Sequence, residues 1–185
     1  MQLLQSTTEI IWFFLPGYVA NMAPVLAARF NWFSFLNAPI DGGRTLNGRR
    51  LLGDNKTWRG IVVGAIAGGV TGILQYAYIS LLSSEKEGLI SYEYLPYVLL
   101  VSVTLGLSAL LGDAVKSLIK RRFNFSPGES WMPWDQLDST LGMIAVTYIF
   151  FTPSVAHVAV ALFVALLGTY IINISAVTLR IKKNI

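Results

Sequence analysis

The stretch PWDQLDSTLGMIAVTYIFF, residues 133–151, decides the fold because it joins a polar beginning to an apolar end. Its uninterrupted apolar part, residues 141–151, would cover only about half of a bilayer core of about 30 Å at about 1.5 Å per residue. A helix that crosses the bilayer here must therefore begin near Pro133, a residue type that suits a first helical turn. Such a start draws Asp135 and Asp138 to the membrane surface, on one face of the helix.

The rest of the chain has the composition of a membrane protein. Of its 185 residues, 54% are hydrophobic and only 13% are charged, which is too apolar for a soluble domain. Besides the stretch that ends at Phe151, four segments are long and apolar enough to cross a bilayer, or nearly so: residues 10–30, 61–82, 95–112 and 155–179. We therefore expect an all-α integral membrane protein with about five transmembrane helices, forming a single domain over residues 1–185.

The basic residues predict how the chain is oriented in the cell membrane. With five spans, 13 of the 14 Lys and Arg residues fall on one side, in segments 29–59 and 113–138 and in the C-terminal tail, whereas Lys86 falls on the other. Because basic loops stay in the cytoplasm, the N-terminus is expected outside, with the C-terminus and two long loops in the cytoplasm. The net charge of +4 then reflects topology and attraction to the lipid bilayer, so no nucleic-acid partner is expected. The pattern predicts no particular oligomeric state.

The first long loop, residues 38–60, is rich in glycine and basic residues. Asp54 or Asn55 could cap the helix that follows. Lys56 and Arg59 would then lie in its first turn, where cations oppose the positive end of the helix dipole. Free backbone amides and these two cations would suit a bound polyphosphate. Simple anchoring of the loop at the cytoplasmic surface is an equally good interpretation.

The second long loop carries a polar helical face. If the third apolar helix continues past Gly112, the next polar side chains share one face: Asp113, Lys116, Ser117 and Lys120. Asp113 would lie at the membrane boundary near the negative end of a helix, where an ionised carboxylate needs a cation. Either an internal ion pair with Lys116 or Lys120, or a divalent metal ion, would meet that need.

A turn at residues 126–128, Ser-Pro-Gly, returns the chain to the membrane and can bring Asp113 close to Asp135 and Asp138. Hard cations such as Mg²⁺ prefer oxygen ligands and are commonly held by carboxylates together with substrate phosphates. The chain has no cysteine, and its one histidine, His157, is expected on the opposite side of the membrane. The residues therefore favour phosphate chemistry over acyl transfer or covalent catalysis.

Three motifs carry a family resemblance. GDAVKSLIKRR (112–122), PG (127–128) and DQLDS (135–139) together resemble the signature of the membrane-bound CDP-diglyceride synthases, or phosphatidate cytidylyltransferases. NKTWRG (55–60) is similar to the Lys-Thr-Trp-Glu-Gly element of the same family. Where the bacterial pattern has further glycines and a histidine after Pro-Gly, this chain has Glu-Ser-Trp (129–131), and its short form is most similar to the archaeal branch, the CDP-archaeol synthases. The resemblance covers residues 21–142.

The resemblance implies a reaction and a set of site residues. CTP and a lipid phosphate would give a CDP-lipid and pyrophosphate with Mg²⁺; in the archaeal branch the lipid is an isoprenoid ether, 2,3-bis-O-(geranylgeranyl)-sn-glycerol 1-phosphate. By position, the catalytic candidates are Asp113, Lys120, Asp135 and Asp138, of which the three aspartates would hold the metal. The substrate-binding candidates matched to the motifs are Lys56, Thr57, Arg59, Ser117 and Arg121.

Two further substrate-binding candidates come from their positions in the sequence. Lys116 shares the polar face of Asp113. Asn21 is a polar residue within the first apolar segment, where it either bonds a neighbouring helix or holds the polar end of a lipid. The active site is accordingly expected at the cytoplasmic face, where CTP and a membrane lipid can meet.

Two rival functions remain at this point. A CDP-alcohol phosphotransferase also binds CDP-lipids through aspartates, and Asp41-Gly42 begins its pattern, but Gly43-Arg44 follows at once and the later aspartates are absent. An ion-coupled membrane transporter would carry ionisable residues near the middle of the membrane. Here these residues gather at one membrane face instead.

Overall fold

The computed structural model describes residues 2–46, 48–82, 88–126 and 129–178. The expectation of an all-α protein is confirmed for these ranges, which hold five α-helices. That all five cross the membrane, with the N-terminus outside, stays a prediction; Lys86 and the C-terminal tail lie outside the described ranges. The elements, in chain order, are α1 (Gln2–Arg29), the 3-10 helix η1 (Ser34–Leu36), β1 (Thr45–Leu46), β2 (Arg49–Arg50), α2 (Trp58–Leu82), α3 (Leu95–Arg122), α4 (Trp134–Thr147) and α5 (Val155–Thr178).

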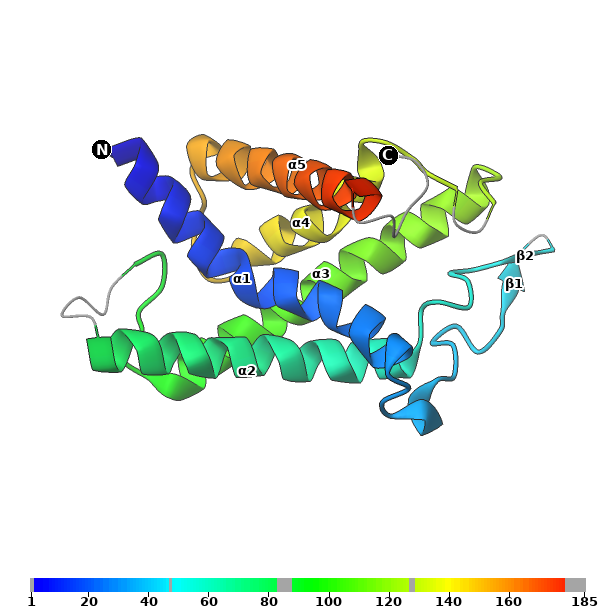
Figure 1. Cartoon of the computed structure of the whole chain (residues 1–185), viewed down its shortest axis with the longest axis horizontal. Coiled ribbons are helices and arrows are strands. Elements are labelled where there is room, and N and C mark those ends of the chain that lie inside the picture. Colours follow the sequence, from blue (N-terminus) through cyan, green and yellow to red (C-terminus); the bar gives the residue numbers. More distant parts are fainter. Residues whose placement is uncertain (1, 47, 83–87, 127–128, 179–185) are drawn as a thin grey trace.

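Three of the helices are long and apolar enough to cross a membrane: α1 over Thr7–Arg29, α2 and α3. A shorter apolar helix covers Val155–Gly168 of α5. α1, α2 and α3 pack against one another, α4 packs against α3, and α5 packs against α4 and α1 (Figure 1). Large apolar side chains such as Leu81 and Leu82 remain exposed on the outside, as expected for a surface that faces lipid.

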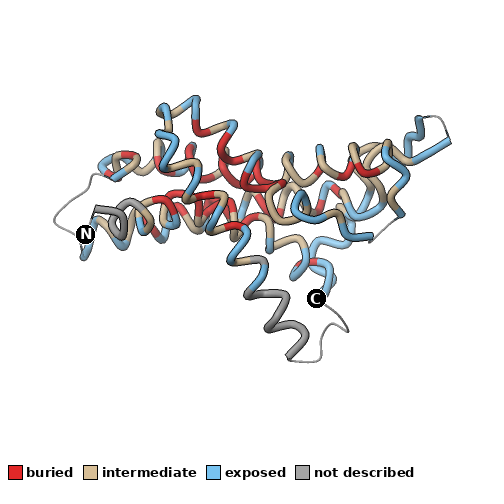
Figure 2. The backbone as a smooth tube through the Cα atoms, turned by 90° about the horizontal axis from the view of Figure 1, so that it is seen from above, coloured by how far each residue is buried: buried red, intermediate tan, exposed pale blue. Residues whose placement is uncertain are grey.

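The core lies where the helices cross, near the middle of the molecule (Figure 2). Ile10 of α1, Val98 and Leu105 of α3 and Met143 of α4 are almost completely buried there. These side chains fix the helices relative to one another at their centres. The polar ends are therefore held in place by a rigid apolar middle.

Two helices differ from the lengths expected from the sequence. α3 does continue past Gly112, and it does so as far as Arg122, which extends it beyond the apolar segment. The prediction that the fourth helix runs to Phe151 is wrong, because α4 ends at Thr147. The rings of Phe150 and Phe151 turn away to pack on Tyr97 and Phe13, with ring centroids 6.4 and 5.3 Å apart respectively. α4 therefore has only 14 residues.

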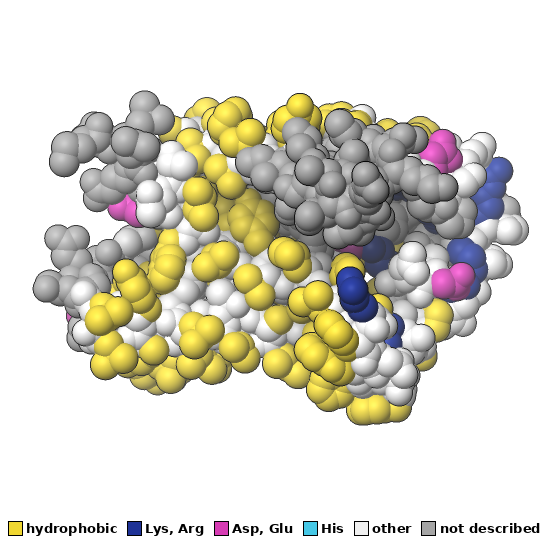
Figure 3. All heavy atoms as spheres, in the orientation of Figure 1, with side chains coloured by type: hydrophobic (Ala, Val, Ile, Leu, Met, Phe, Trp, Pro, Cys, Tyr) yellow, Lys and Arg dark blue, Asp and Glu magenta, His cyan; other side chains and the backbone are white. Residues whose placement is uncertain are grey.

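One end of the molecule is polar. The β1–β2 hairpin, the start of α2, the end of α3 and the start of α4 all lie at this end (Figure 1), and Lys and Arg side chains gather there on the face shown in Figure 3. The hairpin is fastened to α3 by Arg122, whose guanidinium donates to the carbonyl oxygens of Leu46, at 3.0 Å, and Arg50, at 2.9 Å. Both long loops therefore lie on the same side of the helices.

Candidate active site

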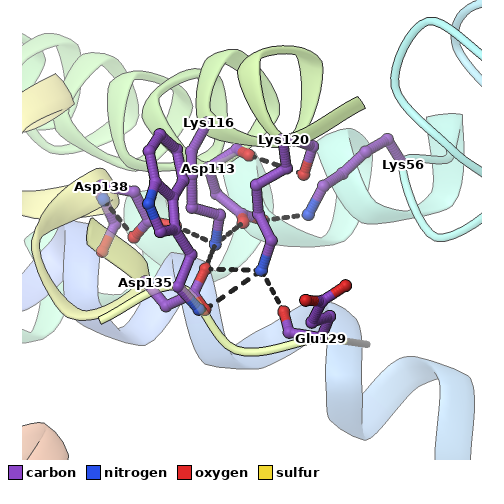
Figure 4. A network of polar contacts seen from close by, with 10 residues as sticks. Lys56, Asp113, Lys116, Lys120, Glu129, Asp135 and Asp138 are labelled. Carbon is purple, nitrogen blue, oxygen red and sulfur yellow. Dashed lines mark hydrogen bonds and ion pairs between the residues drawn. The ribbon is translucent and has the colours of Figure 1, made fainter. Parts of the chain in front are cut away.

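A cluster of carboxylates and lysines lies between α3 and α4 at the polar end (Figure 4). The ammonium of Lys116 lies at its centre, 3.2 Å from Asp113 Oδ1, 3.1 Å from Asp135 Oδ1 and 2.5 Å from Asp138 Oδ2. Three carboxylates that are up to 25 residues apart in the sequence thus meet at one cation. We call these four residues, together with Lys56 and Lys120, the aspartate–lysine cluster.

Lys56 and Lys120 complete the charge balance of the cluster. Lys56 reaches over from the residues before α2 and forms an ion pair with Asp113. Lys120, which is only 6% exposed, lies 3.1 Å from both carboxylate oxygens of Asp135 and also donates to the carbonyl oxygen of Glu129. Three carboxylates are therefore matched by three ammonium groups, which removes the cost of burying either sign alone.

The two helices add favourable dipoles to this network. Asp135 lies in the first turn of α4, where a negative charge is stabilised, and accepts a hydrogen bond of 2.6 Å from the backbone N–H of Trp131. Lys120 lies in the last turn of α3, where a positive charge is stabilised. The start of one helix and the end of the other are thus suited to hold opposite charges side by side.

Two glycines set how closely α3 and α4 cross beside the cluster. A Cβ atom on Gly112 would lie 2.2 Å from the backbone oxygen of Asp138, and one on Gly142 would lie 2.2 Å from that of Ser108. No side chain fits at these distances, so only glycine permits the observed crossing. The crossing fixes the position of Asp138 relative to Asp113.

The first long loop differs from expectation in its helix cap. Thr57 caps α2: its Oγ1 accepts a hydrogen bond of 3.2 Å from the backbone N–H of Gly60. The prediction of Asp54 or Asn55 as the cap is wrong, because Asp54 is drawn instead to the guanidinium of Arg50. Thr57 thus sets the start of α2, just after Lys56.

Ser117 and Arg121 do not join the cluster. The hydroxyl of Ser117 donates to the carbonyl oxygen of Asp113 at 2.9 Å, within α3. The guanidinium of Arg121 donates to the carbonyl oxygen of Phe125 at 2.7 Å, just beyond the end of α3. Their roles in substrate binding therefore stay predictions.

A second buried carboxylate, Asp41, organises the first loop and was not predicted to do so. Its side chain is 2% exposed and accepts hydrogen bonds from the N–H groups of Gly43, at 3.0 Å, and Leu52, at 3.1 Å, and from Arg50, at 3.0 Å. Desolvation raises the pKa of Asp41, but the two N–H donors and the Arg50 guanidinium outweigh it and hold that pKa below its usual value. The signal in the sequence was Asp-Gly-Gly, a common turn composition.

Two cavities adjoin the cluster from either side of α3. The larger, of about 830 Å³, lies between α1, α2 and α3, and both Lys56 and Asp113 belong to its wall. The other, of about 530 Å³, lies between α3 and α4 and has Lys116 and Asp138 in its wall. Each cavity joins a mainly apolar lining to the charged groups, as the binding of an amphiphile requires.

A metal site is not preformed. Within the ranges that the structure describes, no three acidic, His or Cys side chains are grouped so that they could hold a metal ion. Ammonium groups, rather than a shared metal position, separate the carboxylates of the cluster. The predicted Mg²⁺ site therefore stays a prediction.

The fold is that of a helical membrane protein whose charged residues gather at one polar end of the bundle. The model of the CarS-like family, described as CDP-archaeol synthase, matches residues 2–185. The chain therefore belongs to the CDP-archaeol synthase family.

Individual relatives agree with this assignment. CDP-archaeol synthase of Pyrococcus furiosus is 34% identical over 95% of both chains, and that of Archaeoglobus fulgidus is 35% identical over 98% of both. A further relative, from Thermococcus kodakarensis, is 38% identical over 78% of this chain and 76% of its own. A solved structure of an intramembrane enzyme for archaeal membrane lipids biosynthesis is similar with a TM-score of 0.73 and 31% identity, over 89% of this chain and 92% of that one.

Family membership decides between the rival functions. The chain is a CTP-dependent nucleotidyltransferase that forms CDP-archaeol from CTP and archaetidic acid in archaeal lipid biosynthesis. This confirms the function predicted from the motifs at residues 55–60 and 112–139, and it sets aside both the phosphotransferase and the transporter.

Proposed function

We propose that the aspartate–lysine cluster is the catalytic centre of this CDP-archaeol synthase and that it binds CTP together with Mg²⁺ at the cytoplasmic face of the membrane. The observation that carries the proposal is the meeting of Asp113, Asp135 and Asp138 at the ammonium of Lys116. Such a concentration of both charges beside two amphiphilic cavities is what a reaction between two phosphates requires.

The donor atoms fit the metal. Asp113, Asp135 and Asp138 supply carboxylate oxygens, which are the ligands that Mg²⁺ prefers, and they would hold it. When bound, the ion would neutralise charge on the triphosphate and on the pyrophosphate that leaves. The lysines that now meet the carboxylates are long and flexible, so their tips can exchange a carboxylate for a phosphate oxygen.

The chain's own residues then account for the chemistry. A phosphate oxygen of the lipid is already ionised at neutral pH, so its attack needs no general base. It forms a bond to the α-phosphorus of CTP while the bond from that phosphorus to the β-phosphate oxygen breaks, and pyrophosphate leaves with the electron pair. Lys56, Lys116 and Lys120 reduce the repulsion between the two anions and stabilise the leaving group. Thr57 fixes the start of α2 just after Lys56 by accepting the N–H of Gly60, and Ser117 bonds to the carbonyl oxygen of Asp113. These bonds help to hold the backbone that carries Lys56 and Asp113.

The assay that tests this function uses purified protein with CTP, Mg²⁺ and a panel of lipid phosphates, and it measures pyrophosphate release. We expect the unsaturated ether lipid 2,3-bis-O-(geranylgeranyl)-sn-glycerol 1-phosphate to be the preferred substrate, because the family acts on archaeal ether lipids. Turnover of a diacyl glycerol phosphate at an equal rate would contradict that preference. Full turnover without a divalent ion would contradict the role of Mg²⁺.

The orientation has a separate test. The N-terminus is placed outside and the polar end inside, because 13 of the 14 basic residues then lie in the cytoplasm. Cysteines introduced singly at Glu93 and Ser126, both exposed and at opposite ends of α3, should react with a membrane-impermeant reagent from opposite sides of sealed cells. Reaction of the Ser126→Cys variant from outside would reverse the orientation.

A further inference from the structure

Arg59 is a buried cation that stands apart from the aspartate–lysine cluster. It is the second residue of α2 and is only 9% exposed. Whereas Lys56, Lys116 and Lys120 each meet a carboxylate, no residue in the described ranges forms a hydrogen bond or ion pair with the Arg59 side chain. Although the residue is nine-tenths buried, its nitrogen atoms are not among the buried unpaired atoms, so the guanidinium keeps access to the adjoining cavity, where an anion could pair with it.

The surroundings of Arg59 indicate which anion. Arg59 lines the cavity of about 830 Å³ between α1, α2 and α3. The α3 wall of that cavity is apolar, formed by Leu107, Leu110 and Leu111, and the α1 wall includes Pro24 and Val25. These two walls suit hydrocarbon chains, whereas the wall formed by the first loop is polar and includes Asn37, Asn55 and Lys56.

Asn21 is a second polar group in the same cavity. It lies on α1 between the helix prolines Pro16 and Pro24, and its amide likewise has no hydrogen-bond partner among the described residues. An unpaired amide on an apolar helix is a costly feature that a polar ligand group would satisfy. Asn21 and Arg59 therefore face the same cavity as the leucines of α3, and that cavity also reaches Lys56 and Asp113 of the cluster.

We propose that Arg59, assisted by Asn21, binds the phosphate of the lipid substrate, while the lysines of the cluster serve the nucleotide. A lipid phosphate monoester carries a charge of about −1.5 to −2 at pH 7, and a guanidinium can bind it with two parallel hydrogen bonds. The isoprenoid chains then lie along the leucines of α3. This assignment differs from the one suggested by the sequence, in which Arg59 joins Lys56 at the CTP triphosphate, and it rests on the proposal that the cluster binds CTP.

The assignment gives Arg59 a definite task in the reaction. Arg59 holds the attacking phosphate oxygen in the cavity wall while the α-phosphorus of CTP lies at the cluster beside Lys56 and Asp113. Its contribution is the position of the nucleophile, which appears in the affinity for lipid phosphate and not in the affinity for CTP.

The first experiment separates the two substrates by steady-state kinetics. In Arg59→Met, the KM for the lipid phosphate should rise about 10- to 100-fold, as expected for the loss of a charge-assisted hydrogen-bond pair, while the KM for CTP changes by less than about twofold. The KM of Arg59→Lys for the lipid phosphate should lie between those of Arg59→Met and the wild type. Arg49→Met, which removes an exposed arginine of the hairpin, is the matched control and should leave both values unchanged. A rise in the KM for CTP alone, or an equal rise in both, would overturn the assignment.

The second experiment measures binding without turnover. A short-chain dialkyl ether glycerol phosphate, added without CTP, should raise the melting temperature of the wild type in detergent and not that of Arg59→Met. The same ether without the phosphate should act equally on both proteins. Equal stabilisation by inorganic phosphate would make Arg59 a general anion site and overturn the lipid assignment. CTP binding that survives both Lys56→Met and Asp138→Asn would instead overturn the proposed catalytic centre and leave this result standing.

Discussion

Asp41 and Asp138 are both buried carboxylates at the polar end, but they are satisfied in different ways. Asp41 accepts its bonds from backbone N–H groups and an arginine of its own loop, at most 11 residues away. Asp138 accepts one hydrogen bond from the adjacent backbone N–H of Ser139, but its other oxygen pairs with the ammonium of Lys116, 22 residues earlier in the chain, which is shared with two other aspartates. Backbone amides and a planar guanidinium hold one fixed geometry, whereas a lysine tip can change partners. The bonds of Asp41 therefore stabilise one loop conformation, whereas the ion pair of Asp138 can open to admit a substrate.

The largest expected effect tests the exchangeable carboxylate directly. Asp138→Asn keeps the shape of the side chain and removes its charge, so turnover should fall by orders of magnitude while the protein remains folded. Steady-state assays across a Mg²⁺ titration should also show a weaker dependence on the ion. Glu93→Gln, an exposed change at the opposite end, is the control. Near-normal turnover of Asp138→Asn would reduce Asp138 to a helix-start feature.

A second change displaces the shared network and leaves the local one intact. Gly142→Ala places a methyl group where the backbone oxygen of Ser108 lies, so α4 must move away from α3. We expect a loss of about 1–3 kcal/mol of stability, as for other overpacked sites, and at least about a tenfold loss of turnover.

Gly168→Ala in α5 is the matched control for that change, because the added Cβ would meet no atom of the described residues within 4 Å beyond its own stretch of helix. It should keep full turnover and stability. If both variants behave alike, the close crossing of α3 and α4 does not set the geometry of Asp138.

A third change removes the cation at the centre of the cluster. Lys116→Met leaves three carboxylates close together, and breaking a buried ion pair typically costs several kcal/mol. In EDTA the melting temperature should fall by roughly 5–10 °C, and Mg²⁺ should restore more of it than in the wild type. Differential scanning fluorimetry in detergent measures both values. An identical response of the two proteins to Mg²⁺ would show that the carboxylates do not take up the ion.

The smallest expected effect concerns the local carboxylate. Asp41→Asn removes the charge that pairs with the Arg50 guanidinium and should destabilise the first loop by about 1.5–3 kcal/mol. The KM for CTP should rise only severalfold. Because the pKa of Asp41 is lowered by folding, its contribution is present above the unfolded pKa of about 3.9 and is lost as pH falls through the folded value. The protection factor of the Leu52 amide in hydrogen exchange, which corrects for the intrinsic pH dependence of exchange, should therefore fall at acid pH in the wild type. If Asp41→Asn lost as much protection at Leu52 on acidification as the wild type does, the carboxyl group of Asp41 would not be the group that titrates.

The sequence predicted most of what depends on periodicity and on spacing within one helix. The polar face from Asp113 to Lys120 required only that α3 continue, and the start of α4 followed from the shortness of its apolar run. The convergence of Asp113 with Asp135 and Asp138 could be expected because one turn joins the two helices.

What the sequence did not predict depends on contacts between distant residues. Arg122 fastens the hairpin through carbonyl oxygens, which carry no sequence signal. The end of α4 at Thr147 depends on where Phe150 and Phe151 find partners in α1 and α3, and the cap at Thr57 depends on Arg50 drawing Asp54 away. Whether Arg59 has a carboxylate partner could likewise be known only from the packing of three helices.

The shortness of α4 has a consequence for the membrane around the enzyme. With 14 residues, α4 is about 21 Å long, against a hydrocarbon core of about 30 Å. If α4 spans the bilayer, we expect the bilayer to thin beside so short a helix, so that its surface would dip toward Asp135 and Asp138. Water and a soluble nucleotide would then reach these carboxylates without crossing hydrocarbon. Turnover in vesicles of lipids with longer chains should accordingly be slower.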